Sequence, residues 1–343
     1  MLKVYDSSTA RQTLLKRRPI DDMDVPAGVQ QRIAEMFGEP LTPAQVVDRI
    51  LRDIRERGDA ALGDWTERLD GHRPAEFRVP PENLKSALEA LPRDLRSALE
   101  LAASRVRQFH QAQPVTSWIT QALGGTLGQY VRPIRRVGIY VPAGTAPLPS
   151  SVLMSAVPAQ VAGVKEVVLA APPERGTGRV SPVILAAAAL IGIDEVYAIG
   201  GAQAIGALAY GTASIRSVDK IFGPGNLFVT LAKRQVYGVV GIDGLAGPTE
   251  TVVIADDSAR ADWVAADLLA QAEHDVLASA ILLSPSPALI ENVRVEIGRQ
   301  LEERSRANVI SASLEHRSGA VITRDLDEAV ELSNLYAPEH LCL

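Results

Sequence analysis

The sequence has almost no cysteine, few aromatic residues and no long apolar run. Cys342 is the single cysteine among 343 residues, so an internal disulfide is excluded and a reducing compartment, the cytoplasm, is expected. The longest apolar stretch, residues 183–193, is far shorter than the roughly 20 residues that span a bilayer. The first residues lack the continuous apolar segment of a secretion signal. We therefore expect neither a membrane partner nor secretion.

An excess of basic charge is also missing. The chain has 35 Lys and Arg against 41 Asp and Glu, which gives a formal net charge of −6. Nucleic-acid binding needs a basic face, so nucleic acid is not an expected partner. With 47% hydrophobic and 22% charged residues, the composition is that of a globular protein with a sizeable core. The length favours about two domains, because a typical domain has roughly 100 to 200 residues.

The first 120 or so residues carry the periodicity of helices. Apolar residues between positions 46 and 54 fall on one helical face, and Thr42 before Pro43 predicts the N-cap of that helix. Further helices are predicted over 81–90 and 93–111. The turn-rich stretch 116–129 follows them, and a domain boundary is expected near residues 130–138.

From residue 137, short apolar runs alternate with helical segments. Strands are predicted at 137–141, 167–170, 195–199 and 218–222, and later at 251–255 and 280–283. Helices are predicted over 260–274, 285–303 and 325–335. Such alternation is typical of parallel sheets with right-handed crossovers. The predicted fold class is therefore α/β, with two such domains and additional N-terminal helices.

Three glycine-containing loops follow predicted strands, at residues 142–147, 200–203 and 223–226. In an open parallel sheet, ligands bind outside the carboxyl ends of the strands, and a helix that starts there directs free N–H groups at an anion. None of the loops has the full GxGxxG spacing, so a structural turn is the more common explanation for each loop taken alone. Gln203 and Asn226 favour binding, because their amides can contact the sugar or base of a cofactor.

Two polar motifs lie in the last third of the chain. Gln271 and His274 are three residues apart, a spacing that brings two donors to one face of a helix and suits a shared metal. The alternative is a surface or capping arrangement, since two protein ligands are too few for a tight zinc site. Glu339 and His340 follow Pro338 in an expected loop and offer two proton-transfer groups, although surface polarity alone would also explain them.

Together and in this order, these segments resemble the histidinol dehydrogenase family. The strings that carry the resemblance are 137–142 (VGIYVP), 200–205 (GGAQAI), 222–226 (FGPGN), 232–236 (AKRQV), 246–248 (AGP), 271–274 (QAEH) and 336–341 (YAPEHL). The resemblance implies two Rossmann-like domains with incomplete dinucleotide-binding motifs. Their expected extents are an N-terminal segment 1–30, a first domain of 31–137 with 249–343, and a second domain of 138–248.

The resemblance also implies an activity, the oxidation of L-histidinol through L-histidinal to L-histidine with NAD and zinc. It places NAD contacts on Tyr140, Gln203 and Asn226. Thr249, where the family commonly has serine, would contact the substrate. The resemblance assigns zinc and substrate contacts to Gln271 and His274, which implies metal ligation at both. Catalytic proton transfer falls on Glu339 and His340: the histidine takes the alcohol proton and also contacts the substrate, and the glutamate activates water to hydrate the aldehyde.

Family members continue past the position of Leu343 with an aspartate and a histidine that complete the zinc shell and a glutamate for the substrate. The resemblance thus implies an incomplete zinc site within these 343 residues. It also implies that the family homodimer is weakened or lost where that tail is absent. Two alternatives stay open: a non-catalytic remnant that keeps the fold and a cofactor cleft, and a related zinc and NAD dehydrogenase of another polar alcohol.

Overall fold

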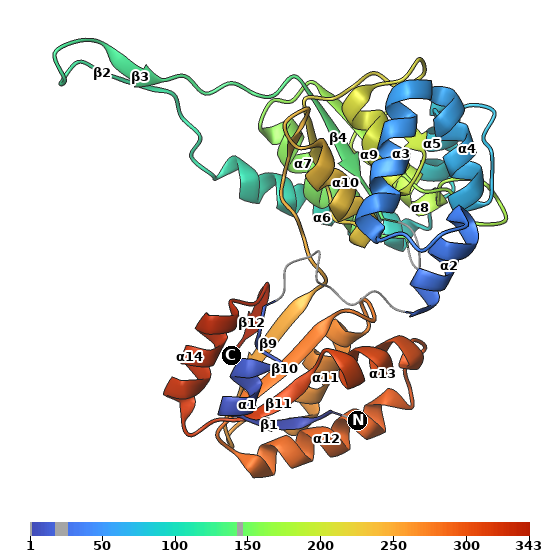
Figure 1. The fold of residues 1–343 in the computed structure, drawn as a ribbon. Helices are drawn as coiled ribbons and strands as arrows, with labels where there is room; N and C mark the ends of the chain where they lie inside the picture. The colour runs from blue at the N-terminus through green and yellow to red at the C-terminus, as the bar shows by residue number, and fades with distance from the viewer. Residues whose placement is uncertain (1, 18–26, 143–146) are drawn as a thin grey trace. The chain divides into compact units, whose positions relative to one another are not determined.

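A computed structural model describes residues 2–17, 27–142 and 147–343 (Figure 1). Its internal contacts divide the chain into two compact units. Unit 1 comprises Met1–Val25 and Gly247–Leu343, and unit 2 comprises Pro26–Ala246. None of the helices in the described ranges is long and apolar enough to cross a membrane.

Unit 2 is built on a five-stranded sheet in which every neighbouring pair is parallel. Its strands are β4 (Arg136–Tyr140), β5 (Glu166–Ala171), β6 (Val196–Ala198), β7 (Lys220–Phe222) and β8 (Gly241–Ile242). Their order across the sheet is β6-β5-β4-β7-β8. The chain adds β5 and β6 on one side of β4 and then β7 and β8 on the other, so the strand order reverses between β4 and β7 while the strands stay parallel. This is the strand order of a Rossmann-type sheet without its sixth strand, and it confirms the predicted α/β class. The four strands predicted here all form, within two residues at each end.

Helices cover both faces of this sheet (Figure 1). The helices of unit 2 are α2 (Ala27–Phe37), α3 (Pro43–Arg57), α4 (Asp59–Asp70), α5 (Pro81–Glu89), α6 (Arg93–Gln111), α7 (Pro149–Val161), α8 (Pro182–Leu190), α9 (Gly201–Tyr210) and α10 (Leu227–Val236). Apolar side chains of α5, α6, α7 and α8 form one core with Ile139 and Leu169 of the sheet. Thr42 caps α3 as predicted, and its side chain and that of Gln45 form a reciprocal capping box.

The N-terminal helices belong to a different sheet from the one expected. The family resemblance implies that residues 31–137 share a domain with residues 249–343, but the structure groups them with β4 to β8 in unit 2. The physical reason is the apolar face of α3, which is buried against α9 and α10 of unit 2. Amphipathic periodicity shows that a helix has a face to bury, but not which sheet buries it.

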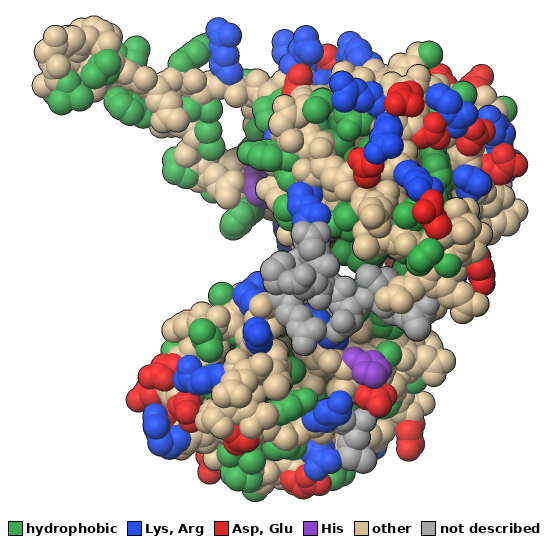
Figure 2. All heavy atoms as spheres, viewed as in Figure 1, with side chains coloured by type: hydrophobic (Ala, Val, Ile, Leu, Met, Phe, Trp, Pro, Cys, Tyr) green, Lys and Arg blue, Asp and Glu red, His purple; other side chains and the backbone are tan. Residues whose placement is uncertain are grey.

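A hairpin extends from unit 2 in the stretch that was predicted only as turn-rich (Figure 1). Strands β2 (Trp118–Thr120) and β3 (Leu127–Gln129) pair antiparallel. Apolar side chains line this hairpin (Figure 2), and Trp118 and Ile119 are 52% and 76% exposed.

Unit 1 contains a second parallel sheet, in the order β1-β11-β10-β9-β12. Its strands are β1 (Val4–Asp6), β9 (Glu250–Ile254), β10 (Ser279–Ser284), β11 (Gly319–Ile322) and β12 (His340–Cys342). Its helices are α1 (Ser7–Gln12), α11 (Ala261–Ala272), α12 (Pro287–Leu301), α13 (Ala307–His316) and α14 (Leu326–Tyr336). Alternate strand residues pack on opposite faces: Val253 and Leu282 meet α11, α12 and α13, while Val252 and Ile281 meet α1 and α14. The sequence prediction missed β1, β11 and β12.

Candidate functional site

The three expected cofactor residues lie at the carboxyl edge of the unit 2 sheet. Tyr140 ends β4, Gln203 lies in the first turn of α9 after β6, and Asn226 follows β7. Strands β4 and β7 are the neighbours between which the strand order reverses, the place where open α/β sheets bind ligands. The remaining glycine loop, 142–147, lies partly outside the described residues, since 143–146 are not among them.

Tyr140 and Gln203 belong to a buried polar cluster with Asp70 from the end of α4. Tyr140 is 4% exposed, its hydroxyl accepts a hydrogen bond from the Gly201 amide at 3.2 Å, and burial raises its pKa to about 12. Gln203 is fully buried and donates through Nε2 to Asp70 at 3.2 Å. Its Oε1 has no hydrogen-bond partner among the described residues. An acceptor in this position suits a ligand hydroxyl or amide, because a buried unpaired oxygen is costly.

Asp70 is a residue that the sequence prediction missed. Burial raises its pKa to about 6, against the opposing influence of Arg175 and of the Gln203 hydrogen bond. No sequence signal marks it, because Asp70 and Gln203 are 133 residues apart.

Asn226 has a structural role beside its expected one. Its Oδ1 accepts hydrogen bonds from the amides of Phe228 and Val229 at 3.1 and 3.2 Å, so it is the N-cap of α10. The side chain is exposed, and its NH₂ group remains as the donor that a ligand could use.

The candidate residues of unit 1 lie at the amino edge of their sheet, where the parallel strands begin. Thr249 precedes β9, His274 lies before β10, and His340 starts β12. His340 is paired in register with Thr251 on β9, which brings the start of β12 beside the start of β9. The rule that ligands bind at carboxyl ends therefore describes the candidates in unit 2 but not those in unit 1.

Glu339 and His340 form an accessible pair. Glu339 Oε1 and His340 Nε2 are 3.9 Å apart, and both side chains are about half exposed. The loop prediction is corrected at His340, which starts a strand. Immediately before them, Ala337 has a left-handed backbone with φ of +49°, unusual for a residue with a Cβ. This conformation ends α14 and turns the chain into β12.

Gln271 and His274 lie around the end of α11, but the helix stops earlier than predicted, at Ala272. A hydrogen bond of 3.2 Å from the His274 amide to the Gln271 carbonyl keeps the two residues in one turn. Gln271 Oε1 is buried without a hydrogen-bond partner, whereas His274 is exposed. The described part of the chain has no group of three or more His, Cys, Asp or Glu side chains that could hold a metal.

Arg17 joins this edge of unit 1, a contact that no sequence signal predicts. It bridges Glu250 at 2.6 Å and donates to the Tyr336 and Ala337 carbonyls at 2.6 and 2.5 Å. Burial raises the pKa of Glu250; Arg17 opposes this, and the nearby charge of Glu339 adds to it. Glu250 is thus a further carboxyl group next to the Glu339 and His340 pair.

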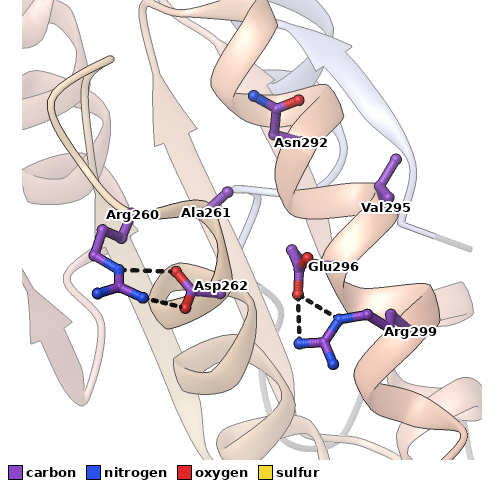
Figure 3. A pocket seen from close by; sticks show the side chains of 7 residues that line it. All are labelled: Arg260, Ala261, Asp262, Asn292, Val295, Glu296 and Arg299. Carbon is purple, nitrogen blue, oxygen red and sulfur yellow. Dashed lines mark hydrogen bonds and ion pairs between the residues drawn. The ribbon is translucent and has the colours of Figure 1, made fainter.

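A surface pocket on unit 1 is separate from all of these residues. It lies between the start of α11 and the middle of α12 and is lined by Arg260, Ala261, Asp262, Asn292, Val295, Glu296 and Arg299 (Figure 3). Arg260 binds Asp262 and Arg299 binds Glu296, at 2.7 and 2.8 Å. The charges of the pocket are paired within it, so it is a poor candidate for binding a charged ligand.

Comparison with known proteins places these features in one family. Residues 40–343 match the sequence profile described as histidinol dehydrogenase. A histidinol dehydrogenase of Deinococcus radiodurans is 53% identical over 344 residues, covering 100% of this chain and 78% of that protein. One from Thermus thermophilus is 52% identical, covering 88% and 71%. The crystal structure of histidinol dehydrogenase from Elizabethkingia anophelis superposes with a TM-score of 0.87 at 34% identity, covering 99% of this chain and 75% of that one.

Proposed function

The chain belongs to the histidinol dehydrogenase family, and from this premise we propose that it oxidises L-histidinol to L-histidine with NAD. Its function is that of a histidinol dehydrogenase, an oxidoreductase of histidine biosynthesis. The observation that carries this conclusion is the 53% identity to a named relative along the whole chain. It favours the family's own activity over a non-catalytic remnant and over a dehydrogenase of another alcohol. The low cysteine content is consistent with action in the cytoplasm.

Tyr140, Gln203 and Asn226 are proposed to bind NAD. The support is their position at the carboxyl edge, around the β4 and β7 reversal, where Gln203 Oε1 is a buried acceptor without a partner among the described residues and the exposed Asn226 side chain carries an NH₂ donor. Tyr140 and Gln203 are themselves buried, so their polar atoms are held in place before a ligand arrives.

Proton transfer is proposed for Glu339 and His340. Both side chains are half exposed and 3.9 Å apart, so a substrate can reach each of them. The His340 imidazole takes the alcohol proton as hydride leaves the carbon, because a neutral imidazole nitrogen can accept a proton within hydrogen-bond reach of the alcohol. The Glu339 carboxylate accepts a proton from the water that adds to the aldehyde carbon. The resulting hydrate keeps the C–H bond of the aldehyde, and that hydrogen leaves as the second hydride while the carbon becomes the carboxylic acid.

Gln271 and His274 are proposed to hold zinc and, with Thr249, to contact the substrate. The buried, unpartnered Oε1 of Gln271 fits an oxygen ligand, and the accessible imidazole of His274 fits a nitrogen ligand. Zinc usually takes four ligands, so these two residues hold it only together with further donors. Bound zinc would supply Lewis acidity toward the alcohol oxygen. Assembly into a homodimer stays a prediction.

Two variants of the catalytic pair test the proposal. NADH formation from histidinol and from histidinal is measured by absorbance for the parent chain, Glu339→Gln and His340→Gln. We expect His340→Gln to slow the alcohol step and Glu339→Gln to slow the aldehyde step, each by about 100-fold or more. A parent chain that binds NAD and histidinol but forms no NADH would contradict the catalytic assignment. Equal rates in the parent and both variants would refute the roles of the two residues.

A further inference from the structure

A buried lysine of unit 2 has no part in the function described above. Lys233, on α10, is 3% exposed, and its Nζ donates to the Gly223 carbonyl at 3.0 Å. It also forms an ion pair with Asp243, which follows β8. The same carboxylate accepts a hydrogen bond from the Gly223 amide at 2.8 Å. One glycine is therefore bound through both its N–H and its C=O by the two members of an ion pair.

Gly223 is the residue that joins β7 to the loop 223–226. Its φ is +111°, and a Cβ added there would lie 2.1 Å from the carbonyl oxygen of Tyr140. The loop thus begins in direct backbone contact with the end of β4. Glycine allows this approach, and because glycine has more backbone freedom than other residues, contacts from outside are needed to fix its conformation.

The contacts close a ring around the loop. Gly223 opens it, Asn226 ends it by capping α10, and Lys233 returns from two turns along α10 to Gly223. Asp243, which follows the neighbouring strand β8, binds both the Gly223 amide and the Lys233 ammonium group. We propose that Lys233 and Asp243 are positioning residues for the loop that binds NAD. They fix Gly223 against Tyr140 and thereby set the direction in which the Asn226 amide and the start of α10 face the cofactor. This inference rests on the proposed function.

The same sheet offers a matched control. Arg136 at the start of β4 is 2% exposed and binds Glu195 at 2.9 Å and Glu166 at 3.0 Å. It is a buried cation with carboxylate partners, like Lys233, but it lies at the amino edge, away from the cofactor loops. If Lys233 had only a structural role, replacing Lys233 and replacing Arg136 would affect NAD binding to the same extent.

The experiment measures NAD binding by isothermal titration calorimetry and unfolding by urea for the parent chain, Lys233→Met and Arg136→Met. We expect Lys233→Met to weaken NAD binding by about tenfold or more, because a hydrogen bond to a charged group is lost from the loop. Arg136→Met should lose stability, because its carboxylate partners are left without their buried cation, but should change NAD binding less than about twofold. In turnover, Lys233→Met should raise KM for NAD much more than it lowers kcat, because the proton-transfer groups are unaltered.

A second pair of variants covers the case in which Lys233→Met does not fold. Asp243 is about one-third exposed, so Asp243→Ala and Asp243→Asn avoid leaving a fully buried gap. The Asn side chain retains an oxygen that can accept a hydrogen bond from the Gly223 amide. We therefore expect the Asp243→Asn protein to bind NAD more tightly than the Asp243→Ala protein does. Folded Asp243→Ala or Lys233→Met that binds NAD as the parent does would overturn the positioning role alone. A parent chain that does not bind NAD would overturn the proposed function, and this inference with it.

Discussion

Replacing Asp70 by asparagine tests the energetics of the buried cluster at the cofactor edge. Asp70 is partly buried, and burial raises its pKa from 3.8 to about 6. The folded state therefore holds this proton more tightly than the unfolded state. The stability that the proton provides is fully present below the unfolded pKa and is lost as the pH rises through the folded pKa. Above that pH, wild-type Asp70 is an ionised carboxylate that burial has partly removed from water, which is unfavourable.

The size of the effect follows from the shift. From 3.8 to about 6, at about 1.4 kcal/mol per pKa unit, the charged form costs about 3 kcal/mol of the free energy of unfolding. Asparagine has no charge and still offers an oxygen to Gln203 Nε2. We expect Asp70→Asn to stabilise the chain near pH 8. Its advantage should shrink by about 2 kcal/mol at about pH 4.5, where wild-type Asp70 is mostly protonated when folded.

The assay is urea unfolding of both proteins at the two pH values, followed by tryptophan fluorescence, to which Trp65, buried on the same helix, contributes. Asp64, also on α4, is the control with the opposite sign. Arg73 and Arg57 lower its pKa, so Asp64→Asn should destabilise near pH 8, with a smaller effect as the pH falls through the folded pKa. A stability difference for Asp70→Asn that does not change with pH would refute the reasoning.

Three further substitutions probe the two edges, each by urea unfolding unless stated. Gly223→Ala should cost about 2 kcal/mol or more, since its Cβ would lie 2.1 Å from the Tyr140 oxygen, and unchanged stability would contradict the close approach. Ala337→Gly should stabilise by up to about 1 kcal/mol, because φ there is +49°, and any clear loss would refute that strain. Arg17→Ala should raise the pKa of Glu250 further in a carbon-13 NMR titration, because Arg17 now lowers it; an unchanged value would show that the bridge is unimportant.

Local patterns in the amino-acid sequence determined where most helices and strands of this protein form. The helix 93–111 forms with the bounds that periodicity predicts, and Thr42 is the cap that its residue type and the following proline indicate. The buried strands of unit 2 follow from apolar runs between turns, since such runs have few other stable arrangements in water. Family strings in the sequence contain the proposed site residues from Tyr140 to His340 except Thr249, which directly follows one of them.

The tertiary structure decided which elements share a sheet and which side chains meet. Helix α3 has an apolar face in the sequence, but only packing against α9 and α10 assigns it to unit 2. Strand β12 was missed because three residues, two of them exposed, carry no pattern; its identity comes from hydrogen bonds to β9. Asp70 beside Gln203, and Arg17 beside Glu250, join residues 133 and 233 positions apart. Periodicity reports the surroundings of a residue over a few turns, whereas such pairs depend on how distant segments pack.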